Sequence, residues 1–196
     1  MCEYELALAD CDEAIRLDPQ SYLAVCTRGT AFLGLGSLAL AAEEFERAIA
    51  PKKDFGLAFN NRAFLHILNS DYPGAIQDLD RAIAAEPTLV PAHLNRAGVA
   101  FCQQRFADAV VDCAEAVRLD PKNIDNSRAW LYFAEARTSQ DARVNLQKHS
   151  ANLNLAKWPG PIIAFLLGSI TEDQLLEAAK HERPPKQREQ FCHPSI

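Results

Sequence analysis

Small and apolar residues recur along this chain at a fixed spacing of 34 residues. The segment from Ala75 to Pro87, AIQDLDRAIAAEP, shows the pattern: a small residue, three spacers, a bulky apolar residue, two spacers, an alanine and then a proline. The pattern returns at Ala7, Cys11, Ala14 and Pro19, at Ala41, Phe45 and Ala48, and at Ala109, Cys113, Ala116 and Pro121. Self-similarity at such a period is the sequence signature of a repeat protein.

Within each period, the apolar positions have the spacing of two amphipathic helices. Complete units are predicted at 22–55, 56–89 and 90–123, and their second helices are predicted to begin near Leu38, Tyr72 and Phe106. The alanines of the second helices mark close helix contacts, at which a larger side chain would overpack. Each unit is therefore expected to be a helix pair that packs chiefly against its neighbours.

The regular grid ends on both sides of these units. Residues 1–21 supply only the second helix of a unit, and residues 124–154 fit as a degenerate repeat in which His149 stands in an alanine register as a packing residue. The segment KWPGP at 157–161 must break any helix. A short helix is predicted to begin at Pro161. Another is predicted to begin directly after Thr171, because Thr171 and Gln174 have capping-box spacing. A further helix is predicted in the last eleven residues. The chain is thus expected to hold a repeat array at 1–154 and a helical extension at 155–196.

The motif ALADCDEAIRLDP at 7–19, together with NNRA at 60–63 and LNRA at 94–97, resembles bacterial tetratricopeptide repeat (TPR) proteins. This resemblance covers residues 1–138 and implies an all-α TPR solenoid, a right-handed superhelix of antiparallel helix pairs, with a short C-terminal helical extension. The tail KWPGPIIAFLLGSITEDQLLEAA is similar to the segment that follows the repeats in NlpI-like TPR lipoproteins, which are adaptors of the bacterial envelope. That similarity implies a periplasmic or envelope-associated protein if the true N-terminus is missing. The acidic first residues, MCEYELALADCDE, carry no secretory signal, so the chain as given predicts a cytoplasmic protein.

An arginine precedes a small residue in the first helix of every full unit, at Arg28, Arg62 and Arg96. One register of the second helices is acidic throughout, at Asp10, Glu44, Asp78 and Asp112. An arginine between helices must keep its charge compensated, and a carboxylate offers bidentate pairing. We therefore expect a structural ladder in which Arg62 pairs with Asp78 of its own unit or Glu44 of the preceding one. The alternative is an anion-binding row of arginines.

A polar residue stands immediately before each arginine, and first helices line the concave side of a TPR superhelix. An asparagine amide both donates and accepts hydrogen bonds, so this row resembles the ladder that holds the main chain of a peptide in some TPR proteins. Solvated groove polarity without a ligand is the alternative explanation. The predicted partner-binding residues are Thr27, Asn60, Asn61, Phe64, Leu94, Asn95, Phe101 and, near the open end of the row, Arg128.

Composition narrows the possible functions. A net charge of −6 without a basic stripe weighs against nucleic-acid binding, and the longest apolar run, Ile162 to Leu167, is too short to insert across a membrane. The six cysteines show neither the close pairs of a zinc site nor the density of a disulfide scaffold. Cys11 and Cys113 are expected to be buried in the core. No nucleophile elbow or phosphate-binding glycine loop occurs, so we expect no catalysis, cofactor or metal.

The sequence therefore predicts a non-catalytic protein–protein interaction module, an adaptor or scaffold that binds a peptide or helix of a partner protein in its concave groove. The alternative is a self-associating scaffold. The helix predicted for Met1 to Leu17 lacks a partner helix, so its apolar stripe should be covered by a second copy of the chain, giving a homodimer, or be disordered.

Overall fold

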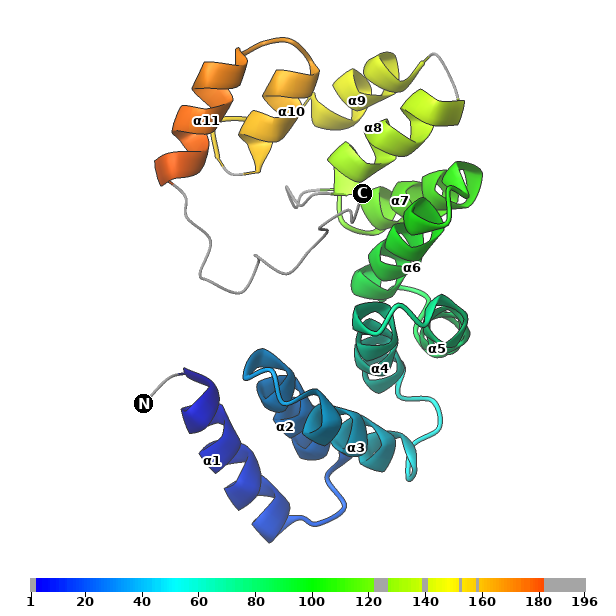
Figure 1. Ribbon diagram of the computed structural model, residues 1–196, viewed down its shortest axis with the longest axis vertical. Coiled ribbons are helices and arrows are strands. Elements are labelled where there is room, and N and C mark those ends of the chain that lie inside the picture. Colours follow the sequence, from blue (N-terminus) through cyan, green and yellow to red (C-terminus); the bar gives the residue numbers. More distant parts are fainter. Residues whose placement is uncertain (1–2, 122–126, 139–140, 152, 158, 182–196) are drawn as a thin grey trace. The chain divides into compact units, whose positions relative to one another are not determined.

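The computed structural model describes residues 3–121, 127–138, 141–151, 153–157 and 159–181, and these ranges contain helices and no strands. The helices are α1 (Glu3–Leu17), α2 (Tyr22–Gly34), α3 (Leu38–Ile49), α4 (Gly56–Leu68), α5 (Tyr72–Ala85), α6 (Val90–Cys102), α7 (Phe106–Leu119), α8 (Ser127–Thr138), α9 (Ala142–Ser150), α10 (Gly160–Leu166) and α11 (Glu172–His181) (Figure 1). The chain divides into two compact units, Met1–Leu119 and Asp120–Ile196.

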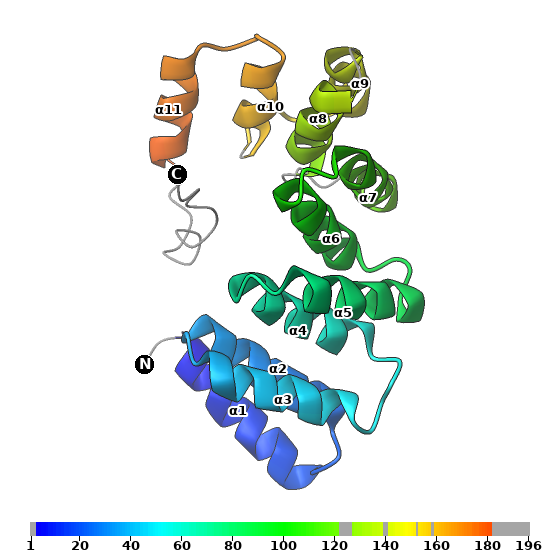
Figure 2. The same ribbon diagram turned by 45° about the vertical axis from the view of Figure 1, so that its right-hand side comes forward.

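Unit 1, Met1–Leu119, is a stack of helix pairs. α2 packs against α3, α4 against α5 and α6 against α7, while α3 also contacts α4 and α5 contacts α6. Figure 2 shows the same stacking of α2–α3 below α4–α5. The second helices begin at Leu38, Tyr72 and Phe106, as the 34-residue grid predicts.

The turn inside each pair has one main-chain conformation in all three full repeats. Its left-handed residue is Gly36 (φ 77°), Ser70 (φ 57°) or Gln104 (φ 59°). The next residue then donates its main-chain N–H to a carbonyl five residues earlier: Ser37 to Phe32 (2.9 Å), Asp71 to His66 (2.8 Å) and Arg105 to Ala100 (2.8 Å). Such a bond closes the last turn of the first helix. The turn therefore repeats even where no glycine supplies the left-handed conformation.

The core of unit 1 is built from the alanines and bulky residues of the repeat pattern. Ala75, Leu79 and Ala82 of α5 are completely buried and pack with Phe59 and Ala63 of α4. The equivalent Ala41, Phe45 and Ala48 of α3 are also completely buried. Because alanine adds only a methyl group, the two helix backbones approach closely at these points. Cys11 and Cys113 are buried as predicted.

Unit 2, Asp120–Ile196, contains α8 to α11. α8 packs against α9, and α10 contacts α8, α9 and α11. The predicted capping box opens α11, since the Thr171 N–H donates to Gln174 Oε1 (2.8 Å) and the Gln174 N–H donates to Thr171 Oγ1 (3.3 Å). The helix predicted for the last eleven residues lies outside the described residues.

The α8–α9 pair occupies the place of the predicted degenerate repeat, with one correction. Ala142 and Leu146 are buried as the grid predicts, but the side chain of His149 is exposed and Ser150 is buried. The buried face of α9 passes from Ala142 to Leu146 and then to Ser150, each four residues further along a helix. His149 lies beside this face, so the prediction of a packing histidine is wrong.

Ala75→Leu is expected to lower the free energy of unfolding by about 1 to 3 kcal/mol, because the added methylenes must displace neighbours in a fully buried contact. Urea unfolding followed by circular dichroism measures this loss. Ala84→Leu places the same side chain at an exposed position of α5 and should stay within about 0.5 kcal/mol of wild type. Equal stability of the two variants would contradict the alanine contact.

Candidate functional site

One face of unit 1 is formed by the first helices α2, α4 and α6. α4 contacts α6 directly, and Asn61 Nδ2 donates to Thr30 Oγ1 (3.2 Å), which joins α4 to α2. α3 and α5 lie on the other side of the stack (Figure 1). We name this surface the first-helix face. Its members are Thr27 and Thr30 of α2, Asn61 and Phe64 of α4, and Leu94, Asn95, Gly98 and Phe101 of α6.

A chain of side-chain hydrogen bonds crosses the first-helix face. Asn95 Nδ2 donates to Asn60 Oδ1 (3.0 Å), Asn60 Nδ2 donates to Asn61 Oδ1 (3.2 Å), and the bond from Asn61 to Thr30 continues the chain. The Thr30 hydroxyl then donates to the carbonyl of Cys26 (3.1 Å). The amides therefore tie the three repeats to one another.

The three amides differ in how much hydrogen-bonding capacity remains for a ligand. Asn60 is only 5% exposed and supports the face from beneath. Asn61 Nδ2 also lies 3.7 Å from the Sγ of Cys26, and burial raises the pKa of that thiol to about 11, so it stays neutral. Asn95 is half-buried, and among the described residues its Oδ1 accepts no hydrogen bond. Asn95 is thus the amide best able to bind a partner.

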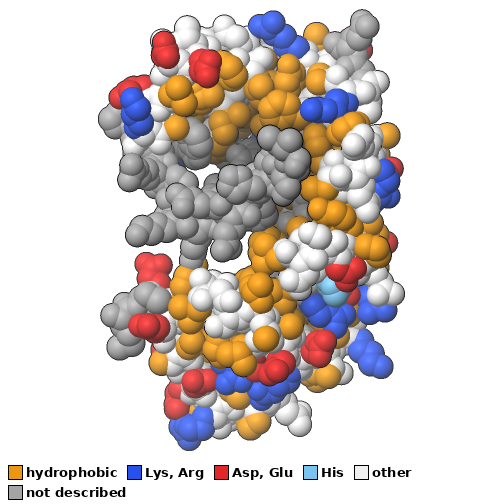
Figure 3. Space-filling view, viewed as in Figure 1, with side chains coloured by type: hydrophobic (Ala, Val, Ile, Leu, Met, Phe, Trp, Pro, Cys, Tyr) orange, Lys and Arg blue, Asp and Glu red, His pale blue; other side chains and the backbone are white. Residues whose placement is uncertain are grey.

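The other predicted groove residues of unit 1 lie on the first-helix face. Thr27 is exposed and donates its hydroxyl to the carbonyl of Leu23 (2.9 Å), while Phe64 and Leu94 are half-buried. Phe101 is half-buried and packs edge-to-face with Phe106 at 5.3 Å between ring centroids. In the lower half of Figure 3, hydrophobic side chains lie among uncharged polar ones, and charged side chains are seen toward the left, lower and right sides.

Arg128 lies in the interior of unit 2, where it is 1% exposed. Its Nε donates to the carbonyl of His149 (3.0 Å) and its Nη2 to the carbonyl of Pro121 (2.7 Å). The expected contact between Arg128 and an acidic partner is therefore not available in this structure. The repeat register gave no clear signal for this, because Arg128 shares its 34-residue register with Cys26 and Asn60, which are buried, and with Leu94, which is half-buried.

Behind the first-helix face, the arginines of the first helices pair with carboxylates of the second helices. Each donates twice to one carboxylate of its own repeat: Arg28 to Glu44 (3.1 and 2.9 Å), Arg62 to Asp78 (2.7 and 2.8 Å) and Arg96 to Asp112 (2.9 and 2.7 Å). These carboxylates are 9%, 2% and 4% exposed. The predicted ladder is confirmed, and its arginines do not form a row open to anions.

A second carboxylate comes from the preceding repeat, but not from the predicted register. Arg28 Nη1 donates to Asp12 and Arg96 Nη1 to Asp80, each at 2.7 Å. The pKa of Arg62 is raised first by its hydrogen bonds to Asp78, and the charge of Glu46 adds to this effect. The neighbour across the repeat boundary is thus Glu46, two residues beyond the predicted Glu44.

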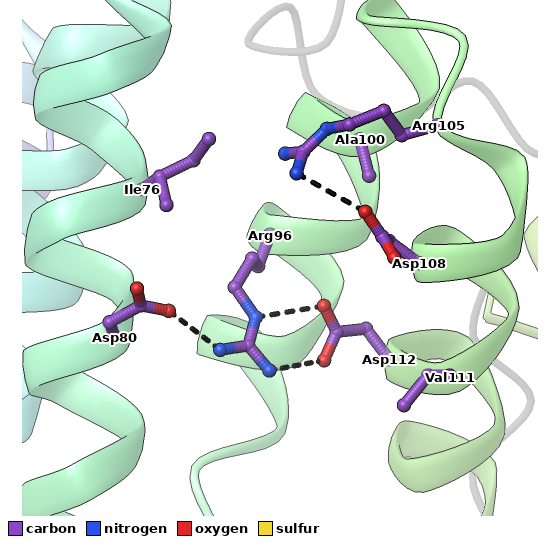
Figure 4. Close-up of a pocket in the computed structure, with 8 residues that line it drawn as sticks. All are labelled: Ile76, Asp80, Arg96, Ala100, Arg105, Asp108, Val111 and Asp112. Carbon is purple, nitrogen blue, oxygen red and sulfur yellow. Dashed lines mark hydrogen bonds and ion pairs between the residues drawn. The ribbon is translucent and has the colours of Figure 1, made fainter.

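A pocket of about 290 Å³ opens where α5, α6 and α7 meet. The residues that line it are Ile76, Asp80, Arg96, Ala100, Arg105, Asp108, Val111 and Asp112. Figure 4 shows the guanidinium of Arg96 between Asp80 and Asp112, with Arg105 directed at Asp108 (3.2 Å). Each charged group of the pocket is paired with another of its lining groups. The pocket therefore offers a ligand no uncompensated charge.

The described ranges show neither a metal-binding group of side chains nor a membrane-spanning helix. These ranges hold no group of three or more His, Cys, Asp or Glu side chains placed to bind a metal ion. They also contain no helix with the length and apolar character that a membrane crossing requires.

Comparison with known families agrees with the helix pairs and their period. Residues 3–56 and 60–124, more than half of the chain, match the family model described as tetratricopeptide repeat. The chain belongs to the tetratricopeptide repeat family. The all-α TPR solenoid predicted from the sequence is confirmed, and TPR domains are built from the paired helices seen in unit 1.

Solved structures share this fold at low sequence identity. A crystal structure of MamA is 16% identical, with a TM-score of 0.63 over 76% of this chain and 87% of that chain. A thermophilic TPR protein of Thermus thermophilus is 17% identical, with a TM-score of 0.64 over 85% and 89%. YrrB, a TPR protein with an unusual peptide-binding site, is 19% identical, with a TM-score of 0.60 over 86% and 84%. These similarities concern the fold.

Arg62→Met is expected to lower the free energy of unfolding by about 3 kcal/mol, because it leaves the buried Asp78 without its main countercharge. This is the low end of the usual range, since the Arg62 side chain is 21% exposed and the pair is not completely desolvated. Urea unfolding measures the change. The double variant Arg62→Met/Asp78→Leu should recover most of it, since an apolar pair can replace a buried ion pair.

The control for this prediction is Arg118→Met, which removes an arginine from an exposed pair with Glu115 on α7. Its melting temperature should stay close to that of wild type, because an exposed ion pair contributes little. If Arg62→Met were as stable as Arg118→Met, the ladder would not hold the helices of a repeat together.

Proposed function

We propose that this TPR protein is a non-catalytic interaction module whose first-helix face binds a peptide or helix of a partner protein. The observation that carries the proposal is the composition of that face: half-buried apolar side chains surround one amide with spare hydrogen-bonding capacity, and the arginines are paired behind it. The fold similarity to YrrB, a TPR protein with an unusual peptide-binding site, supports the use of such a surface.

Apolar burial must supply most of the affinity. A hydrogen bond contributes about 0.5 to 1.5 kcal/mol net, whereas micromolar binding needs about 8 kcal/mol. Asn95 can therefore orient a bound segment but cannot hold it alone. Burial of apolar area at about 25 cal/mol per Å² can supply the remainder, and Phe64, Leu94 and Phe101 provide that area.

The proposal includes neither nucleic-acid binding nor membrane insertion, which agrees with the net charge of −6. It treats residues 1–154 as the repeat array and 155–196 as its extension. The tail sequence favours an NlpI-like adaptor of the bacterial envelope, and a cytoplasmic adaptor is the alternative. Cell fractionation of the natural protein distinguishes these two compartments.

Site-specific photo-cross-linking tests the binding face. A benzoylphenylalanine at position 27, on the first-helix face, is expected to cross-link a discrete partner, because Thr27 is exposed beside the predicted groove. The same group at position 84, an exposed site on α5, is the matched control and should give no such product. Mass spectrometry identifies the partner, and titration with the purified partner gives its affinity. Cross-linking from position 84 but not from position 27 would place the binding surface on the second helices.

Self-association through α1 is the second candidate function. α1 packs against α2 and buries Cys11, but Leu6 (50% exposed), Leu17 (70%) and Leu23 (57%) remain exposed at this end of unit 1. Exposed large apolar side chains favour association of repeat ends. Sedimentation equilibrium should then show a dimer that Leu6→Glu/Leu17→Glu converts to monomer. A wild-type monomer at every concentration would contradict this alternative.

A further inference from the structure

The first helices of unit 1 carry no charge on the first-helix face. α2, α4 and α6 have 13 residues each, and none of them contains a lysine, an aspartate or a glutamate. Their arginines pair with second-helix carboxylates. Their histidines are engaged as well: His66 Nδ1 lies 2.7 Å from Asp71, and His93, 5% exposed, contacts the carbonyl of Pro87 through Nε2 at 2.9 Å. The accessible part of this face is thus uncharged: it combines half-buried apolar side chains with threonine hydroxyls and asparagine amides.

Gly98 is a glycine in the interior of α6, with open space where a side chain would stand. No atom of the described residues outside its own stretch of helix lies within 4 Å of a Cβ placed there. Glycine inside a helix is less stable than alanine, because it loses more conformational freedom on folding. No close contact with the described residues therefore requires a glycine at position 98.

Two other helix glycines of unit 1 show what such a position accommodates. A Cβ at Gly29 would stand 2.7 Å from the aromatic ring of Phe45, and a Cβ at Gly34 would collide with the ring of Tyr4. In both places the missing side chain leaves room for an aromatic ring from a neighbouring helix. Gly98 provides the same room without an occupant from the described residues.

The surroundings of Gly98 suit an apolar group. Gly98 is half-buried and stands in the 34-residue register of Thr30 and Phe64, so it lies on the first-helix face. Residues three or four apart are neighbours on a helix surface, which places Leu94 and Phe101 on either side of it. Asn95, three residues before Gly98, adds the amide with spare capacity. We name this site the Gly98 seat: Leu94 and Phe101 flank it, and the Asn95 amide can hydrogen-bond to a group bound there.

We propose that the first-helix face binds an uncharged segment of a partner protein, and that a large apolar side chain of this segment, aromatic or leucine, seats on Gly98. The inference rests on the proposed function and adds the chemistry of the partner. A charged group laid against this face would lose its hydration without gaining a countercharge. The Asn95 amide would bind a main-chain group of the same segment.

The probe is a displayed library of random peptides selected on the wild-type chain. The selected peptides should be uncharged in their contact region and share a Phe, Tyr, Trp or Leu. Their dissociation constants should change less than about twofold when NaCl rises from about 50 to about 500 mM, because no exposed ion pair contributes to binding. Thr27→Glu adds a charge to the face and should weaken binding.

Two variants at Gly98 test the seat. Gly98→Leu fills it and should weaken binding by more than about tenfold, whereas Ala84→Leu, the matched control on α5, should leave binding within about twofold of wild type. Gly98→Ala should raise the melting temperature and yet weaken binding. Because the melting temperature rises while binding weakens, a general loss of structure cannot explain the weaker binding. Gly98→Ala also keeps the test valid if Gly98→Leu unfolds.

The outcomes distinguish the inference from the function on which it rests. Charged contact regions, or an affinity that falls about tenfold with salt, would overturn the uncharged partner and leave the face in place. Binding unchanged by both Gly98 variants would overturn the seat. If the wild type selected no peptide, or if Thr27→Glu bound the selected peptides normally, the proposed function itself would fail and the inference with it.

Discussion

Bidentate pairing between an arginine of the first helix and a carboxylate of the second is the interaction on which the surface of this protein depends. In each full repeat the guanidinium is held between helices by a carboxylate that is almost completely buried. Such pairs contribute little net stability, because desolvation of both charges offsets their attraction. Their main effect is to fix the positions of the arginine side chains. The pairing draws the arginines to the second-helix side and leaves the first-helix face without charge.

Connections between repeats use different chemistry on the two sides of the stack. Behind the face, Arg28 and Arg96 reach carboxylates of the preceding repeat, so charge crosses the boundary there. On the face, the boundary is crossed by neutral amides and hydroxyls, from Asn95 through Asn60 and Asn61 to Thr30. A neutral network can lie beneath an apolar ligand at lower cost than an ion pair, because less hydration is lost when water is excluded.

The asparagines show how one residue serves both stability and binding. The row of amides that resembles a peptide-binding ladder is used largely for contacts within the protein. Asn60 is buried, and Asn61 donates to α2, so the spare capacity is concentrated at Asn95. Gly98, one turn further along α6, had no place in the sequence interpretation, because a glycine in LNRAGVAFC resembles any other small helix residue. The structure adds that the space beside Gly98 is empty, whereas the ring of Phe45 fills the space beside Gly29.

The sequence by itself determined the period, the starts of the helices and the registers of the arginines and carboxylates, but it left Arg62 with a choice between Asp78 and Glu44 that the structure decided for Asp78. All three follow from short-range rules, because residues three, four or seven apart share a helix face and a short turn brings the two helices of a unit together. Only the tertiary structure decided that Arg28 reaches Asp12, that Asn95 reaches Asn60, that Arg128 is buried and that His149 is not. The contacts across repeat boundaries depend on the angle at which one helix pair packs on the next. That angle is set by the summed shapes of many side chains, which a repeat register does not contain.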